Sequence, residues 1–170
     1  FKRSDSAKAI DYYTRSLKIY EEIGDKFGMA HSCHNIGLIY YEQGNYAKAI
    51  DYCARSLKIE EELGNKKGIS HSLNTIGILY NDQGNYAKAI DYYTRSLNIR
   101  EELGDKKGTA MCLNNIGILY KNQGDYAKAM DYYTRTLKIR EELGDKKGIA
   151  SSLNNIGTIY YEQGDYAKAK

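Results

Sequence analysis

The three histidines of this chain are the residues whose type and spacing best suit metal binding. His31 and His34 are about one helical turn apart, and His71 follows His31 by 40 residues. Three imidazoles can ligate zinc or nickel. However, neighbouring helix axes lie about 8–10 Å apart, and no carboxylate supports the trio. We therefore interpret these side chains as solvated polar surface and predict no metal site.

The sequence shows none of the residue patterns that carry common enzyme chemistry. It has no HExxH, no phosphate-cradling glycine loop, and no serine or cysteine placed with a histidine and a carboxylate at a recognised spacing. We therefore predict that the chain is not an enzyme, has no catalytic residues and uses no cofactor.

Three cysteines, Cys33, Cys53 and Cys112, occupy places where the equivalent residues are Leu, Tyr or Ser. A disulfide framework would not be confined to single repeats, so we predict reduced thiols in a cytoplasmic protein.

Charge and hydrophobic patterning exclude two classes of partner. A net charge of +3 from 25 basic and 22 acidic residues gives no basic face of the kind that neutralises phosphates, so we expect no nucleic-acid binding. There is also no run of about 18 apolar residues and no export leader, so we expect no membrane association. A content of 42% hydrophobic and 28% charged residues is typical of a folded chain.

The elements that position these residues are set by the 16 glycines, which fall into four sets spaced by 40 residues. Such a period is typical of a solenoid, in which each unit buries its apolar face against its neighbours. The sets begin at Gly24, Gly28, Gly37 and Gly44. For the Gly28 set we predict relief of crowding against the preceding helix, and for the Gly37 set a close approach of two helices.

Each repeat predicts two antiparallel helices. Leu113, Ile116 and Tyr120 recur at helical spacing; Gly124 then ends the helix and Asp125 caps the next. The second helix has its own apolar stripe, which runs through Tyr126, Ala129, Met130, Tyr133, Thr136, Leu137 and Leu143. We expect joins of one or two residues and helices at about 5–23, 27–43, 45–63, 67–83, 85–103, 107–123, 125–143 and 147–163.

The period also predicts the domain organisation. We expect one repeat array that is a fragment of a longer protein, because the last full helix repeats the core pattern instead of showing a polar outer face. Its parts are a half repeat at 1–24, repeats at 25–64, 65–104 and 105–144, and a half repeat at 145–170.

At these positions the whole chain resembles the tetratricopeptide repeat (TPR) family. The resemblance rests on the first-helix pattern of Ile36, Gly37, Tyr40 and of Ile116, Gly117, Tyr120; on the turns Gly44-Asn45-Tyr46 and Gly124-Asp125-Tyr126; and on the second-helix pairs Ala49 with Cys53, Ala89 with Tyr93, and Ala129 with Tyr133. It implies an all-α fold: a right-handed superhelical solenoid of antiparallel helix pairs.

The chain departs from the common repeat of about 34 residues. Glu61, Glu101 and Glu141 stand where that repeat has a closing proline, so the second helix can continue to Leu63, Leu103 and Leu143. This long form is similar to the 40-residue repeats of kinesin light chains, Pins-type adaptors and many bacterial signalling proteins, all of which are binding scaffolds.

The resemblance implies that the first helices line a concave groove. Asparagine offers an acceptor and two donor hydrogens, which match a peptide backbone, and in long-repeat relatives a row of asparagines has this role. Asn35, Asn115 and Asn155 match that row, and Thr75 interrupts it. The candidate peptide-binding residues are His31, His34, Asn35, Tyr41, His71, Asn74, Thr75, Asn114, Asn115, Lys121, Asn154, Asn155 and Tyr161.

Two alternatives bear on this groove. The asparagines can instead bond neighbouring helices or water. A clamp for a C-terminal carboxylate, known in other family members, is disfavoured because the corresponding residues supply no cation of the required kind; they are His34, Leu38, Thr75, Met111 and Asn115.

We therefore expect a protein-interaction scaffold that binds a partner peptide or helix within a larger signalling or adaptor protein. The alternative is a self-association module in which the exposed face of helix 147–163 docks on helix 5–23 of another copy, head to tail.

Overall fold

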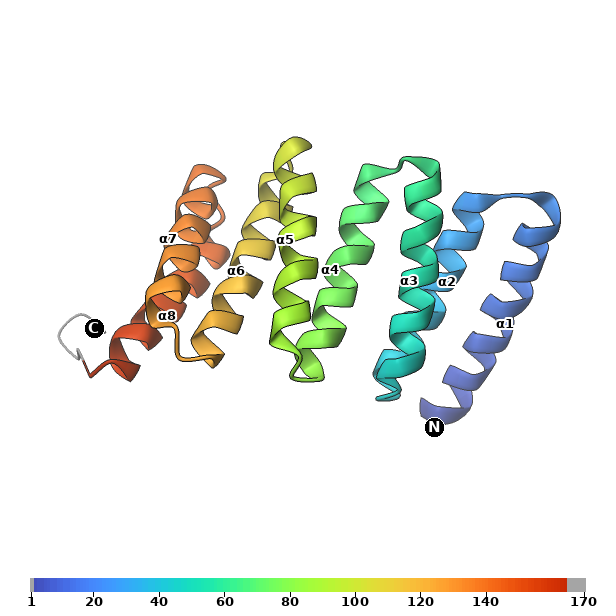
Figure 1. Cartoon of the computed structure of the whole chain (residues 1–170), viewed down its shortest axis with the longest axis horizontal. Coiled ribbons are helices and arrows are strands. Elements are labelled where there is room, and N and C mark those ends of the chain that lie inside the picture. Colours follow the sequence, from blue (N-terminus) through green and yellow to red (C-terminus); the bar gives the residue numbers. More distant parts are fainter. Residues whose placement is uncertain (1, 165–170) are drawn as a thin grey trace. The chain divides into compact units, whose positions relative to one another are not determined.

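A computed structural model describes residues 2–164 of the chain, and all regular secondary structure in this range is helical. The predicted all-α class is confirmed. The helices, labelled in Figure 1, are α1 (Lys2–Ile23), α2 (Lys26–Glu42), α3 (Tyr46–Leu63), α4 (Lys66–Asp82), α5 (Tyr86–Glu102), α6 (Lys106–Asn122), α7 (Tyr126–Glu142) and α8 (Lys146–Glu162). The last six residues of the predicted half repeat 145–170 lie outside the described residues.

The joins after α1 and α3 are two residues long, within the predicted one or two, whereas the other five in the described range are three residues long, so the prediction was wrong for these. The difference arises because the last turn tightens before the chain reverses. At the end of α2, the Asn45 N–H reaches back to the Tyr40 carbonyl at 2.8 Å, while Gly44 adopts a left-handed φ of 72°. This is a Schellman-type ending, which satisfies carbonyls that the helix leaves open.

The predicted capping residues begin the helices as expected. Asn45 accepts from the Lys48 N–H at 3.2 Å, and Asp125 accepts from the Lys128 N–H at 3.1 Å. A side-chain oxygen at the N-cap satisfies a backbone donor that has no partner within the helix. The same device starts α2, α4, α6 and α8, where the caps are Asp25, Asn65, Asp105 and Asp145.

The chain divides into two compact units, which are described separately. The first runs from Phe1 to Tyr92; within it α2 packs against α1 and α3, and α3 also packs against α4. Its core includes Leu17, Cys33 and Ile36, with Tyr40 and Tyr52 packed around them. Consecutive helices therefore bury their apolar stripes against one another, as the repeat pattern predicts (Figure 1).

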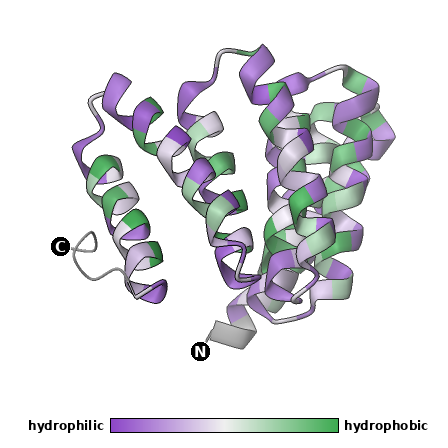
Figure 2. Ribbon diagram, turned by 60° about the vertical axis from the view of Figure 1, so that its left-hand side comes forward, coloured by the Kyte–Doolittle hydropathy of each residue, from purple (hydrophilic) through white to green (hydrophobic). Residues whose placement is uncertain are grey.

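The second unit runs from Tyr93 to Lys170, and within it α7 packs against both α6 and α8. Ala129, Tyr133 and Ile159 form its buried centre. Hydrophobic residues recur along the helices and the turns are hydrophilic (Figure 2). The prediction was wrong for Leu143, which is exposed because it lies just past the end of α7.

The Gly37 set allows two helices to approach closely, as predicted. A Cβ added at Gly37 would lie 2.7 Å from the Sγ of Cys53, and one at Gly117 would lie 2.7 Å from the Tyr133 ring. Both distances are too short for an ordinary side-chain contact. The residue on the second helix therefore fills the space that the glycine leaves.

Candidate functional site

The Gly28 set marks a junction where the end of one helix covers the start of the next. A Cβ at each of these glycines would collide with the side chain found eight residues earlier. The glycine and covering-residue pairs are Gly28 with Tyr20, Gly68 with Glu60, Gly108 with Arg100, and Gly148 with Arg140. The predicted relief of crowding is confirmed. The crowding group is a tyrosine, then a glutamate, and then an arginine in each of the last two repeats.

At the second junction of the first unit, over Gly68, the covering residue is an acid. Glu60 is only 9% exposed, and its Oε2 accepts a hydrogen bond of 2.7 Å from the Nδ2 of Asn65. The Oδ1 of Asn65 caps α4 by accepting from the Gly68 N–H at 3.3 Å. Burying a carboxylate is costly unless hydrogen bonds compensate it, and Asn65 supplies one.

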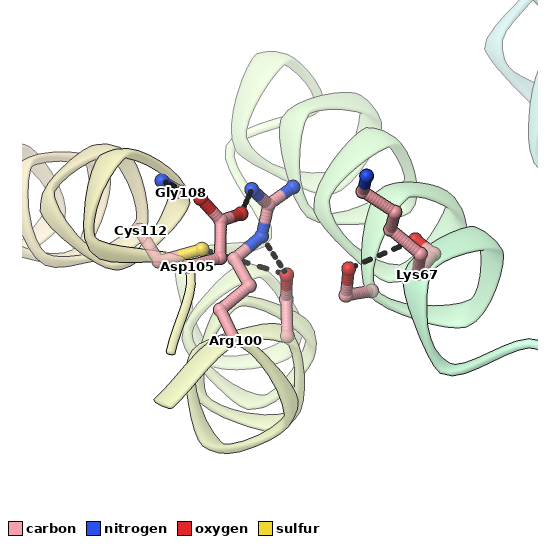
Figure 3. A network of polar contacts seen from close by, with 7 residues as sticks. Lys67, Arg100, Asp105, Gly108 and Cys112 are labelled. Carbon is pink, nitrogen blue, oxygen red and sulfur yellow. Dashed lines mark hydrogen bonds and ion pairs between the residues drawn. The ribbon is translucent and has the colours of Figure 1, made fainter. Parts of the chain in front are cut away.

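In the second unit the covering residue is basic. The Nη1 of Arg100 donates to Oδ2 of Asp105 at 3.0 Å, and its Nε donates to the Ser96 hydroxyl at 3.2 Å (Figure 3). Arg140 makes a related arrangement: its Nη1 donates to the Gly148 carbonyl and to the Ser152 hydroxyl, each at 2.9 Å. In both repeats the chain places its own guanidinium over the glycine.

A pocket of about 240 Å³ opens in the first unit between α2, α3 and α4. The short acidic side chain of Glu60 stands at this junction, where the second unit has long arginines. The lining residues are Phe27, Ala30, His31, His34, Ser56, Glu60, Gly68, His71 and Ser72. The pocket thus combines a carboxylate, two hydroxyl side chains and all three histidines of the chain.

The three histidines meet at this pocket. The rings of His34 and His71 lie 4.8 Å apart between centroids, and His31 contacts Asn35 on its own helix. Burial, followed by the neighbouring rings of His71 and His31, lowers the pKa of His34 to about 4. Within residues 2–164, no three His, Cys, Asp or Glu side chains are placed to share a metal ion.

Within each unit, polar side chains connect the first helix of one repeat to the first helix of the next, α2 to α4 and α6 to α8. The contacts involve predicted contact residues or their neighbours. In the first unit the Tyr41 hydroxyl donates to Oδ2 of Asp82 at 2.7 Å, a bond that raises the pKa of Tyr41 to about 12. In the second unit Asn155 donates to Asn114 at 3.0 Å, and Lys121 lies 4.0 Å from Glu162. The alternative role of bonding a neighbouring helix is thus observed for Asn155.

The remaining predicted contact residues differ in accessibility. Asn74 and Thr75 are buried, and the Thr75 hydroxyl donates to the His71 carbonyl on the same helix. His31, His71, Asn154 and Tyr161 are exposed, whereas Asn35 and Asn115 are half-buried. Buried Asn74 and Thr75 offer little surface to a partner.

The thiols of Cys33, Cys53 and Cys112 are free and buried. Burial raises the pKa of each, to about 12 for Cys53. The thiolate is the reactive form, so a raised pKa leaves these thiols unreactive. They serve as small core residues.

The covering residues Tyr20, Glu60, Arg100 and Arg140 were missed at the sequence level. A signal was available: the position changes chemistry between repeats while the glycine eight residues later stays constant. The matching change at the cap, from Asp105 to Asn65, is a second signal. Neither signal shows which residue covers the glycine, because that depends on how far the second helix of the preceding repeat extends.

A sequence profile of the tetratricopeptide repeat family matches residues 1–62, 28–102, 68–142 and 109–170. These overlapping matches span the chain, which therefore belongs to the tetratricopeptide repeat family. No curated protein sequence gives a match to the chain.

Solved structures show the same fold at low sequence identity. BtubC (BKLC) from P. vanneervenii matches with a TM-score of 0.88 and 24% identity, over 99% of this chain and 70% of that one. A putative kinesin light chain with nearly identical TPR-like repeats, from Podosopora anserina, matches with a TM-score of 0.80 and 12% identity, over 99% and 83%. A Rap protein complexed with Competence and Sporulation Factor matches with a TM-score of 0.76 and 22% identity, over 99% and 47%.

In the described part of the chain, no helix has both the length and the apolar content that crossing a membrane requires.

Proposed function

We propose that this chain is a protein-interaction scaffold that binds an extended or helical segment of a partner on the face formed by its first helices. In each unit this face carries residues from two first helices, α2 with α4 and α6 with α8. We further propose that the scaffold belongs to a longer signalling or adaptor protein, as a single repeat array. The Rap protein, solved in complex with a factor, supports the proposal by analogy of fold.

The observation that carries the proposal is that predicted contact residues reach the next first helix of the same unit. Tyr41 reaches Asp82 on the next first helix, and Asn155 reaches Asn114 in the same manner. Side chains from consecutive repeats are therefore close enough to contact one continuous ligand. Asn115 and Asn154 on this face retain exposed surface and amide groups that suit a peptide backbone.

Selection from a random peptide library displayed on phage tests the proposal. Peptides enriched on the full chain are synthesised, and their affinities are measured by fluorescence anisotropy. The double variant Asn115→Ala/Asn154→Ala is expected to lose about tenfold or more in affinity. The control Asp131→Ala/Lys138→Ala changes exposed residues of the second helix α7 and is expected to bind normally. No enrichment, or equal loss in both variants, contradicts the proposal.

A second candidate function, head-to-tail self-association, is favoured by one observation. Leu153 of α8 is 52% exposed, whereas its equivalent Leu113 in α6 is 1% exposed. Tyr12, Ile19 and Ile23 of α1 are also largely exposed. Apolar surface of this kind can mark a contact between copies. Light scattering against concentration tests this: growth in mass that Leu153→Glu abolishes supports self-association, and a constant monomer mass opposes it.

A further inference from the structure

We propose that the pocket between α2, α3 and α4, lined by Glu60, Ser56, Ser72 and the three histidines, binds the guanidinium group of an arginine in the partner segment. The inference rests on the proposed function and deepens it, because it names a side chain that the partner supplies.

The sister repeats show what this junction accommodates. In the second unit Arg140 donates to the Gly148 carbonyl and to the Ser152 hydroxyl. The residues 80 positions earlier are Gly68 and Ser72, and both line the pocket. The chain therefore repeats the groups that accept hydrogen bonds from a guanidinium in a place where it supplies none of its own.

Arg100 supports the same conclusion. It is 7% exposed and donates to the hydroxyl of Ser96, whose equivalent 40 residues earlier is Ser56. Ser56 also lines the pocket. At the position of Arg100 itself stands Glu60, which adds a carboxylate to the acceptors. The repeat thus replaces a buried cation by a buried anion and leaves the surrounding hydroxyl groups in place.

The size and charge of the pocket select a guanidinium. A water molecule takes about 30 Å³ of liquid volume, so a pocket of about 240 Å³ has room for a planar group of several heavy atoms. Glu60 has a neutral amide, Asn65, as its hydrogen-bond partner. Arginine presents a rigid fork of donors that matches a carboxylate and adjacent hydroxyls, and its plane stacks on rings such as the exposed Phe27 and His31.

The natural chain can be tested with small probes. All three histidines line the pocket, so their ring C–H signals in a proton NMR spectrum report on it without further labelling. N-acetyl-arginine amide is expected to shift the His34 and His71 signals in a saturable manner. N-acetyl-citrulline amide has nearly the same shape without the charge and is the matched control. Equal shifts with both probes, or no shift with either, overturn the proposal.

A double variant provides the second arm. Glu60→Arg/Asn65→Asp recreates the pair that Arg100 and Asp105 form, so it is expected to fold and to fill the pocket with its own guanidinium. The arginine probe should no longer shift the histidine signals of this variant. Glu60→Gln keeps the shape and should weaken the probe by about tenfold or more. Unchanged probe binding in the double variant contradicts the proposal.

The outcome is separable from that of the proposed function. If the selected peptides bind and depend on Asn115 and Asn154 but the arginine probe fails, the scaffold function stands and the pocket assignment falls. If the probe binds the pocket but no peptide is selected, the guanidinium site stands and the peptide-binding function falls.

Discussion

The side chain of Asn65 donates a hydrogen bond of 2.7 Å to the buried carboxylate of Glu60, while its Oδ1 caps α4 by accepting from the Gly68 N–H. An aspartate could cap the helix equally well, but it could not donate to Glu60. In the next repeat both residues change together: Arg100 takes the place of Glu60, and Asp105 takes the place of Asn65. At these two junctions the cap residue therefore complements the covering side chain: asparagine donates to the carboxylate of Glu60, and aspartate accepts from the guanidinium of Arg100.

The first prediction concerns this match. Asn65→Asp keeps the cap but places two carboxylates together in a site where Glu60 is 9% exposed. We expect a loss of about 1–3 kcal/mol in the free energy of unfolding, measured by urea denaturation at pH 7.

The compensating change should restore stability. In the Asn65→Asp background, Glu60→Arg is expected to be stabilising, whereas the same change beside Asn65 gains no ion pair. A double-mutant cycle measures this coupling between positions 60 and 65. A coupling energy near zero contradicts the charge match.

The second prediction concerns Gly28. Alanine normally stabilises a helix interior relative to glycine by about 1 kcal/mol. Here a Cβ would lie 2.5 Å from Cγ of the Tyr20 ring, so the ring must move. We expect Gly28→Ala to lower the melting temperature, with a free-energy cost of about 1–3 kcal/mol. In a Tyr20→Ala background the same change should be neutral or stabilising; an equal loss in both backgrounds would exclude the collision.

The third prediction concerns pH. Burial lowers the pKa of His34 from its ordinary value of 6.5 to about 4, so between these values the unfolded chain takes up a proton that the folded chain does not. This contribution to stability is fully present above about pH 6.5 and is lost as the pH falls toward 4. Because the ring is only partly buried, we expect a loss of about 1–2 kcal/mol, less than the full shift implies.

His34→Asn isolates this effect, since asparagine occupies the equivalent positions 74, 114 and 154. Urea denaturation of both proteins at pH 7 and pH 5 gives the comparison. Stability should fall more steeply with acid in the natural chain than in the variant. Identical pH profiles would show that His34 titrates normally in the folded state.

The fourth prediction concerns the thiols. Because Cys33, Cys53 and Cys112 are buried and their pKa values are raised, the folded chain should react slowly with a thiol reagent such as DTNB at pH 8. All three should react rapidly in urea. Fast labelling of any thiol without denaturant would show that its part of the core opens readily.

The elements were predictable from the sequence because the signals that define them are local. Asp125 caps α7, Gly44 reverses the chain, and Ile116 is buried, each as the repeat pattern predicts. The junction was not predictable in this way. Which residue covers the glycine depends on how far the second helix extends before the chain reverses. This length places Glu60 over Gly68. Nor does one repeat reveal that Asn74 is buried, since its neighbours come from other helices.

The nearness of Glu60 and Asn65 in sequence has a consequence for how such arrays grow. Five positions separate the two residues, so a duplication or exchange of a whole 40-residue segment carries both whenever its breakpoint falls elsewhere in the repeat. A new copy then arrives with a cap residue that already suits its covering residue. Repeats with an acidic or a basic covering residue can thus change places along an array, and the neighbouring repeat needs no compensating change at its cap.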